Sequence, residues 1–259
     1  MRRGFRLKKV ARDVFIAPRL IQSWVFMPVR FEVPKGKFRD CTLLAGFHGI
    51  GETGYITVSY MVHALKARRV GFIRTANPPA FVTTTRCGLL TPFEIYRRGD
   101  LVMVKLEFPP HRSEEAEIAR TMACWAVDEK FREALLVGGL DVGFKNGRHE
   151  SRIVPTRAYW PRAKSLGIPL LEQGLYVYGP LAIMLGEFEA NNFPAVAILP
   201  YADVSRSDPR AALVAVRTVS KACHLNIDIS DLENYAKVIE ADLDQRTKIA
   251  RKSTHGMYV

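Results

Sequence analysis

The chain has 259 residues, of which 48% are hydrophobic and 10% aromatic, so it can bury the core of one large α/β domain or two small ones. This composition argues against disorder along the whole chain, and no apolar run approaches the ~18 residues of a membrane-spanning helix. Lys and Arg outnumber Asp and Glu by 38 to 26, and this net charge of +12 favours an acidic partner.

The positive charge is concentrated at both ends. Residues 1–40 hold eleven Lys or Arg and three Asp or Glu, and the basic residues after Asp244 have no acid among them. The positive charge of the N-terminal arm is explained equally well by solubility and by an acidic partner. Nucleic-acid binding is an alternative that no interleaving of basic and aromatic residues supports; it would use Arg2, Arg3, Arg6, Lys8 and Lys9.

The four cysteines are scattered and include no C-x-x-C pair. Such usage is typical of a reduced, intracellular protein rather than of a disulfide framework or a zinc site. The Arg-rich start lacks the apolar segment of a secretory signal. We therefore expect a cytoplasmic protein that binds no membrane.

The first half of the chain alternates strand-like and helix-like segments. The apolar run 41–47 stops at a glycine cluster, as a buried strand would, and 53–67 has apolar residues near helical spacing. Residues 68–74 form a second strand-like run. Residues 93–108 are predicted to form a hairpin, because two strand-like runs flank an Arg-Arg-Gly-Asp turn.

The middle of the chain is predicted to start with a helix from Ser113, its N-cap, to about Arg132, since glutamates in the first turns favour the helix dipole. Residues 134–140 form another buried strand. Residues 141–172 are polar and rich in Gly and Arg, and we expect loop with short strands there.

The last third continues the alternation. Gly179-Pro180 opens a helix, 195–202 is a strand, and Asp208 caps a helix whose first residue is Pro209. Ser230 with Glu233 forms a capping box for a last helix to about residue 250. This order of elements predicts a largely parallel sheet with helices on both faces, and the hairpin adds antiparallel pairing.

Residues 46–54, GFHGIGETG, follow the first predicted strand and open the first helix. Gly49, Gly51 and Gly54 match the G-x-G-x-x-G turn whose backbone N–H groups approach a phosphate at a helix N-terminus. The acidic residue of that fingerprint is missing, because the next strand ends at Arg74. The alternative is a structural turn in which these glycines and Gly46 permit close packing and positive φ.

No catalytic or metal-binding set stands out. The six histidines share no metal-ligand spacing, and His48 with Glu52 is better explained by a surface loop pair than by a catalytic base. Ser205 and Ser207 fit turn and cap positions, because no G-x-S-x-G surrounds them. We expect no catalytic residue, no metal and no cofactor.

Residues 40–243 resemble the archaeal branch of the proteasome assembly chaperone 2 family. The stretches that carry the resemblance are LLAGFHGIGETGYITVSYMV (43–62), VGGL (137–140), YGPLAIMLGEFEANNFPAVAILPYA (178–202) and DPRAALVAVRTVSKACHLNIDISDLENYA (208–236). His48 and the basic N-terminal arm depart from the family pattern.

This resemblance implies a three-layer α/β/α domain with a mostly parallel, mixed central sheet, similar to nucleoside phosphorylases. It also implies a non-enzymatic, ATP-independent assembly chaperone or activator that binds α subunits of the proteasome core particle. Such a protein would be a homo-oligomer, with or without a paralogous chain. A phosphorylase-like enzyme that acts on nucleosides or nucleotides and holds phosphate at the 46–54 turn is the alternative.

The sequence ends on Met257-Tyr258-Val259, a hydrophobic–Tyr–any-residue tripeptide like that of several proteasome activators and chaperones. In their docking mode the terminal carboxylate pairs with a lysine between adjacent α subunits, and the tyrosine and its apolar neighbour pack beside it. A tail packed on its own domain is the other interpretation. We divide the chain into a basic arm with the first strands (1–39), the family domain (40–243) and a basic, flexible docking tail (244–259).

Overall fold

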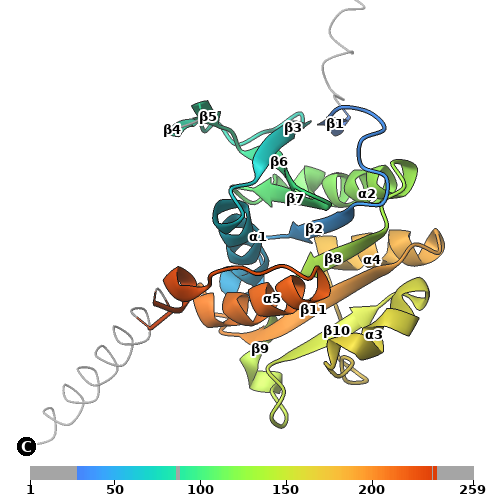
Figure 1. The fold of residues 1–259 in the computed structure, drawn as a ribbon, viewed down its shortest axis with the longest axis vertical. Coiled ribbons are helices and arrows are strands. Elements are labelled where there is room, and N and C mark those ends of the chain that lie inside the picture. The colour runs from blue at the N-terminus through green and yellow to red at the C-terminus, as the bar shows by residue number, and fades with distance from the viewer. Residues whose placement is uncertain (1–27, 86–87, 235, 238–259) are drawn as a thin grey trace, which may run out of the picture.

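The computed structural model describes residues 28–85, 88–234 and 236–237, and these form an α/β domain around one large mixed sheet (Figure 1). The order of strands across that sheet is β1 (Arg30–Glu32), β3 (Arg68–Arg74), β6 (Phe93–Arg98), β7 (Leu101–Leu106), β2 (Thr42–Gly46), β8 (Glu133–Val137), β11 (Ala195–Ala202) and β10 (Ser151–Pro155). A ninth strand, β9 (Leu140–Asp141), pairs with the end of β11. Strands β4 (Thr83–Thr85) and β5 (Gly88–Leu90) form a separate hairpin.

The parallel part of the sheet lies at its centre, where β7, β2, β8 and β11 pair in parallel. On one side β1, β3, β6 and β7 pair antiparallel, and on the other side β10 runs against β11. The two-residue connection between β6 and β7 requires antiparallel pairing. The expected α/β fold with a mixed sheet is confirmed, but the described sheet is not mostly parallel, because four of its strand pairs are parallel and four are antiparallel.

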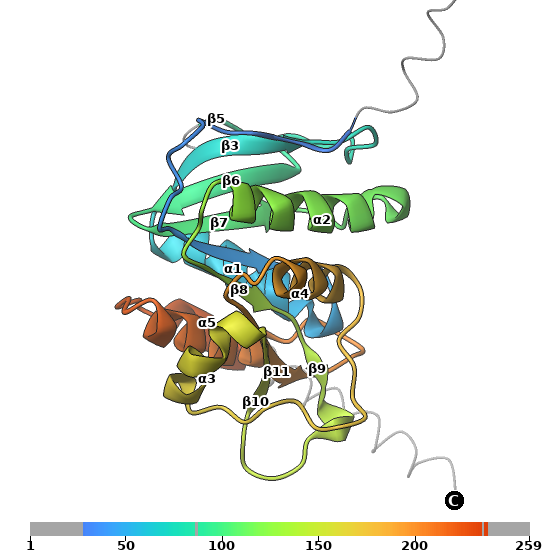
Figure 2. The ribbon, with the colours of Figure 1, turned by 90° about the vertical axis from the view of Figure 1, so that its right-hand side faces the viewer.

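Helices cover both faces of the sheet (Figure 2). One face carries α1 (Thr53–Ala64), α3 (Trp160–Leu166) and α5 (Pro209–Ala222), and the opposite face carries α2 (Arg112–Asp128) and α4 (Pro180–Ala190). Three short 3-10 helices connect these elements: η2 (Ile50–Glu52), η3 (Val142–Phe144) and η4 (Arg157–Tyr159).

The central strands are apolar on both sides because each side faces a helix layer. In β2, Leu43 and Ala45 belong to the core under α2 and α4, whereas Leu44 belongs to the core under α1 and α5. All five residues of β2, all five of β8 and all eight of β11 are buried. The continuous apolar runs in the sequence therefore mark the centre of the sheet.

Two helix starts differ from the predictions. The N-cap of α2 is His111, whose ring accepts a hydrogen bond from the backbone N–H of Ser113, so Ser113 as N-cap was wrong. Pro109 and Pro110 lie between β7 and α2, so His111 is the first residue after them that can cap α2. The last helix was predicted to be capped by Ser230, but there the side chain of Asp228 accepts a hydrogen bond from the N–H of Ser230. The part of this helix beyond residue 237 lies outside the described residues.

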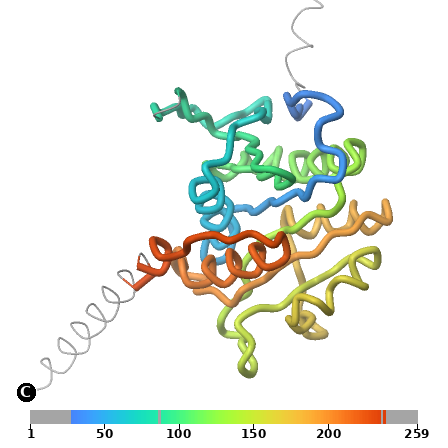
Figure 3. Tube along the Cα trace, viewed as in Figure 1, coloured from blue at the N-terminus to red at the C-terminus, as the bar shows by residue number. Residues whose placement is uncertain are grey.

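Other boundaries agree closely with the predictions. Asp208 caps α5 by accepting from the N–H groups of Arg210 and Ala211, and α4 begins at Pro180. Helix α3 lies within 141–172 and was not predicted, because it is short and has Pro161 in its first turn. The described chain starts beside β1 at one edge of the sheet and ends beside α1 and α5 (Figure 3). In the described part no helix is long and apolar enough to cross a membrane.

Candidate functional site

Strands β2 and β8 are parallel neighbours at the centre of the sheet, and the chain leaves them towards opposite edges. From β2 the chain passes through α1 to β3 on one side, and from β8 it continues through β9, β10, α3 and α4 to β11 on the other side. Helices α1 and α4 lie on opposite faces. In open α/β sheets, a crevice forms at such a switch point beyond the carboxyl ends of the strands.

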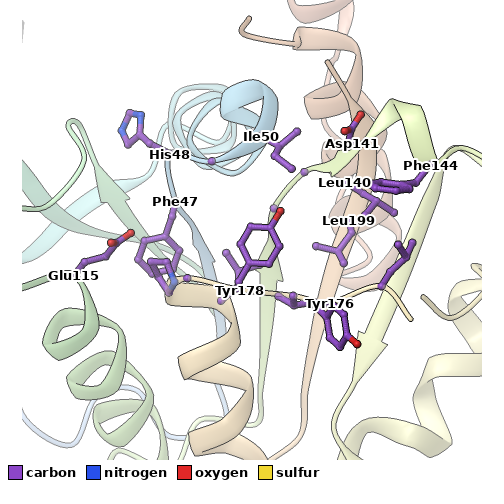
Figure 4. Close-up of a pocket in the computed structure, with 18 of the residues that line it drawn as sticks. Phe47, His48, Ile50, Glu115, Leu140, Asp141, Phe144, Tyr176, Tyr178 and Leu199 are labelled. Carbon is purple, nitrogen blue, oxygen red and sulfur yellow. The ribbon is translucent and has the colours of Figure 1, made fainter. Parts of the chain in front are cut away.

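A cavity of about 490 Å³ occupies this place (Figure 4). Its walls come from the segment after β2, the segment after β8, and the loop that leads into α4. The larger apolar side chains that line it are Phe47, Ile50, Leu140, Phe144, Leu175, Val177, Leu181 and Leu199. Figure 4 shows the ring of Tyr178 in the middle of this set, between Phe47 and Leu199.

The glycines around the crevice permit close backbone contacts. A Cβ atom at Gly46 would lie 2.4 Å from the carbonyl oxygen of Gly54, and a Cβ at Gly54 would lie 2.5 Å from that of Val137. A Cβ at Gly139 would lie 2.2 Å from the carbonyl oxygen of Ile50. Such distances are excluded for real side chains, so only glycines at these positions allow β2, α1 and β8 to pack this closely.

The other two glycines of the 46–54 turn differ from these. Gly51 has φ +62°, and a Cβ there would approach Ala202, whereas a Cβ at Gly49 would meet nothing within 4 Å. The residue that caps α1 is Glu52, at φ 49°, and its carboxylate accepts a hydrogen bond from the hydroxyl of Ser207. A carboxylate at the start of α1 opposes a phosphate there, so this geometry favours the structural interpretation of the turn.

His48 faces away from the cavity centre in Figure 4. Its Nε2 lies 3.0 Å from the carbonyl oxygen of Leu106, which can only accept, so Nε2 carries a proton. The ring stacks on Tyr55 with 4.3 Å between ring centroids, and Nδ1 lies 3.7 Å from Glu52. The structure thus brings His48 and Glu52 together as a pair at the edge of the turn, with the imidazole tied to β7.

The loop 172–179 forms the outer wall of the cavity and was not singled out in the sequence. It contains Gly174 at φ +92° and Gly179 at φ +73°, conformations that favour glycine. Between them Tyr176 and Tyr178 are 79% and 76% exposed. The aromatic run between two glycines, GLYVYG, is the sequence signal that could have identified it.

This loop is anchored at its start by a buried arginine. Arg152 on β10 donates to Glu172 with 2.6 Å between Nε and Oε1, and it also donates to the carbonyl oxygens of Ser151 and Asn146. The guanidinium lies over the ring of Tyr201, 5.3 Å from its centroid. The hydrogen bond from Arg152 lowers the pKa of Glu172.

The charged side chains that line the cavity are acidic. They are Glu115, in the first turns of α2, and Asp141, whose Oδ1 accepts from the N–H of Gly143 at 2.7 Å. No Lys or Arg of the described ranges lines this cavity, although the chain as a whole carries a net charge of +12. An anionic ligand is therefore disfavoured.

Several residues considered from the sequence lie elsewhere or have structural partners. Arg74 pairs with Glu32 and lies on β3, three strands from β2, about 14 Å away at the usual strand spacing. The hydroxyl of Ser205 donates a hydrogen bond to Asp203, and this hydrogen bond lowers the pKa of Asp203. Among the described residues no group of three or more His, Cys, Asp or Glu side chains could hold a metal ion. Met257, Tyr258 and Val259 lie outside the described residues.

Comparisons with known proteins gave one family and a set of structural matches. The model of the PAC2 family matches residues 43–247. PbaA from Pyrococcus furiosus, an archaeal homolog of proteasome-assembly chaperone, has 19% identity and a TM-score of 0.75 over 88% of this chain and 100% of that chain. A search of curated proteins gave no match.

Two further structures have the same fold. PbaB from Pyrococcus furiosus, an archaeal proteasome activator, has 19% identity and a TM-score of 0.69 over 86% of this chain and 100% of that chain. A PAC2 family protein from Streptomyces avermitilis has 16% identity and a TM-score of 0.62 over 80% of this chain and 95% of that chain. At these identities the matches show the fold and nothing finer.

Proposed function

Since the chain belongs to the PAC2 family, we propose that it binds the proteasome core particle as an assembly chaperone or an activator and catalyses no reaction. The observation that carries this proposal is the family match across residues 43–247, which spans nearly the whole described α/β domain. Two proteins of the same fold, an archaeal homolog of proteasome-assembly chaperone and an archaeal proteasome activator, support it.

The proposed contact is made by the C-terminal tripeptide with the α ring. A carboxylate on Val259 would pair with a lysine between two adjacent α subunits, and Tyr258 would supply a flat apolar ring with a hydroxyl at its edge. Met257 would fill the remaining apolar space. The basic residues Arg251 and Lys252 would steer the tail towards an acidic rim.

One tripeptide buries little surface, so we propose that several tails act together on a homo-oligomer, with or without a paralogous chain. Linked tails rebind at a high effective concentration, which strengthens binding without any new contact. Light scattering of the chain alone should then give a mass of at least twice the 29.2 kDa of one chain. A monomer that nevertheless binds the α ring tightly would contradict this part of the proposal.

Co-purification with assembled core particle tests the proposal. The full chain and a chain that ends at Gly256 are mixed with immobilised core particle, and we expect recovery of the full chain only. A chain with Gly-Ser appended after Val259 is the matched control, since it keeps the side chains and removes the carboxylate from its place. Equal recovery of all three would exclude docking through the tail.

Binding of the folded domain without the tail would point to a different surface of the same protein. A chain that ends at residue 237 separates the two cases, because it retains every helix and strand of the described domain. If this shortened chain is recovered as well as the full chain, the family function stands and the tail is not its means. If neither is recovered, the proposed partner is wrong.

A further inference from the structure

The cavity at the switch point has the size and place of a small-molecule site. Its volume of about 490 Å³ lies within the range of roughly 300–1,000 Å³ that is usual for such sites. It opens beyond the carboxyl ends of β2 and β8, where open α/β sheets bind their ligands. Docking of the C-terminal tail on the α ring makes no use of it.

The walls of this cavity are held in place by contacts that leave little room for collapse. Gly139 and Ile50 are in close backbone contact, so the segments after β8 and after β2 cannot approach further. The outer wall, loop 172–179, is tied to β10 through the ion pair of Arg152 with Glu172. A preformed cavity loses less entropy on binding than one that must be ordered by its ligand.

Exposed aromatic rings mark the mouth of the cavity. Tyr176 and Tyr178 are 79% and 76% exposed, and Phe144 on the opposite wall is 55% exposed. Large apolar groups gathered around a hollow are typical of a binding site. In Figure 4 the ring of Tyr178 lies against the space between Phe47 and Leu199, where it would cover a bound molecule.

Two carboxylates lie near the crevice. Glu52 is the N-cap residue of α1, without a side-chain cap hydrogen bond, and Glu115 lines the cavity from the first turn of α2. Helix N-termini favour negative charge, so the N-terminus of α2 stabilises the carboxylate of Glu115. Glu115 has no hydrogen bond or ion pair from its carboxylate within the described part of the chain, so it is free to pair with a cation.

We propose that this cavity binds a small organic cation, an ammonium group on an apolar aliphatic or aromatic body. The body displaces water from Phe47, Leu181 and Leu199. The ammonium group pairs with the carboxylate of Glu115, and the ring of Tyr178 covers the apolar body.

Three probes with a shared phenethyl body test the charge preference: phenethylammonium, phenethyl alcohol and phenylpropionate. Titration of the full chain at neutral pH, followed by saturation-transfer NMR, should rank them in this order of affinity. We expect phenethylammonium to bind about 2–5-fold more tightly than the alcohol, which is the upper range for a solvent-accessible ion pair with Glu115. Equal or tighter binding of phenylpropionate would overturn the proposal.

Substitutions at the mouth test the assignment of residues. Glu115→Gln should weaken phenethylammonium several-fold and leave the alcohol unchanged, because only the charge is removed. Glu150→Gln is the matched control, since Glu150 is an exposed carboxylate that lines a different hollow beside β10, and it should change neither. An unchanged affinity for phenethylammonium in Glu115→Gln would contradict the assignment.

Substitution of Tyr178 provides a second test, which changes no charge on the protein. Tyr178→Ala should weaken both the ammonium and the alcohol probe, whereas Tyr178→Phe keeps the ring and should retain both. The side chain is 76% exposed, so neither variant should affect folding, which circular dichroism can verify. No saturable binding up to ~10 mM by folded protein would overturn the proposal, because ligands of this size reach millimolar affinity in a fitting site.

Discussion

Arg152 on strand β10 and Glu172 at the start of loop 172–179 form an ion pair in which Nη2 and Oε1 are 2.5 Å apart. The arginine side chain is 6% exposed and the glutamate 36% exposed, so the pair spans from the sheet to the surface. Because Glu172 starts the loop that carries Tyr176 and Tyr178, this pair fixes the outer wall of the cavity.

Removal of the arginine should therefore be costly. Arg152→Met leaves Glu172 and the carbonyl oxygens of Ser151 and Asn146 without their donor. We expect a loss of about 1–3 kcal/mol in the free energy of unfolding, measured by urea denaturation. Arg157→Met is the control, because Arg157 is 88% exposed and 3.8 Å from Glu189, and it should change stability by less than ~0.5 kcal/mol. Equal effects of the two substitutions would contradict the anchoring role.

The same pair predicts a pH dependence. The pKa of Glu172 is lowered by its hydrogen bond from Arg152, so the carboxylate stays charged to a lower pH in the folded state than in the unfolded state. Its contribution to stability is therefore present above the unfolded pKa of about 4.3 and is lost as the pH falls through the lower folded pKa. The difference in unfolding free energy between the parent and Glu172→Gln should be constant near neutral pH and should shrink below about pH 4. A difference that stays constant into strong acid would contradict this.

The glycine contacts predict opposite effects at two positions. Gly139→Ala would place a Cβ 2.2 Å from the backbone oxygen of Ile50, which cannot move aside, so we expect a loss of about 1–3 kcal/mol. Gly186→Ala in α4 meets nothing within 4 Å and should stabilise the protein by about 0.5–1 kcal/mol. Thermal unfolding of both variants gives the comparison, and a neutral Gly139→Ala would mean that the crevice walls are not held by this contact.

Cysteine reactivity tests burial. Burial raises the pKa of Cys223 to about 12 and also raises those of Cys41 and Cys124, but Cys124 is exposed on α2 whereas Cys41 is buried and Cys223 half-buried. The thiolate is the reactive form, so iodoacetamide in mildly alkaline buffer should label Cys124 at least ~10-fold faster than Cys223. Peptide mapping by mass spectrometry reports each site. Rapid labelling of Cys223 in the folded protein would contradict its burial beside Glu133.

The sequence predicted the centre of the fold well and its edges poorly. Strand β11 and the helix that starts at Pro180 were predicted within a residue or two, because buried runs and Pro or Asp caps are local signals. Strands within residues 1–39 were expected without bounds, and β4 and β5 were not identified at all, since each of these strands has three residues and none is fully buried. Pairing of such strands depends on distant neighbours, as in Arg30 opposite Arg74.

The candidate site was predicted only in part. The 46–54 turn was singled out, and its glycines also matched a phosphate-binding pattern that lacked the acidic residue. The close approach of Gly46 to Gly54 and of Gly54 to Val137 favours packing. The loop 172–179 joins this turn through contacts between segments more than a hundred residues apart. No local pattern encodes that meeting, and the same holds for the ion pair of the buried Arg152 with Glu172.

The central claim is that a tyrosine beside a free carboxyl end binds the α ring, and equilibrium binding of Tyr258 variants to immobilised core particle tests it most directly. The full chain and Tyr258→Phe should bind with similar affinity, because the ring supplies most of the buried area. Tyr258→Ala should bind at least ~10-fold more weakly, as expected for truncation of an aromatic anchor. An affinity for Tyr258→Ala equal to that of the full chain would contradict the account.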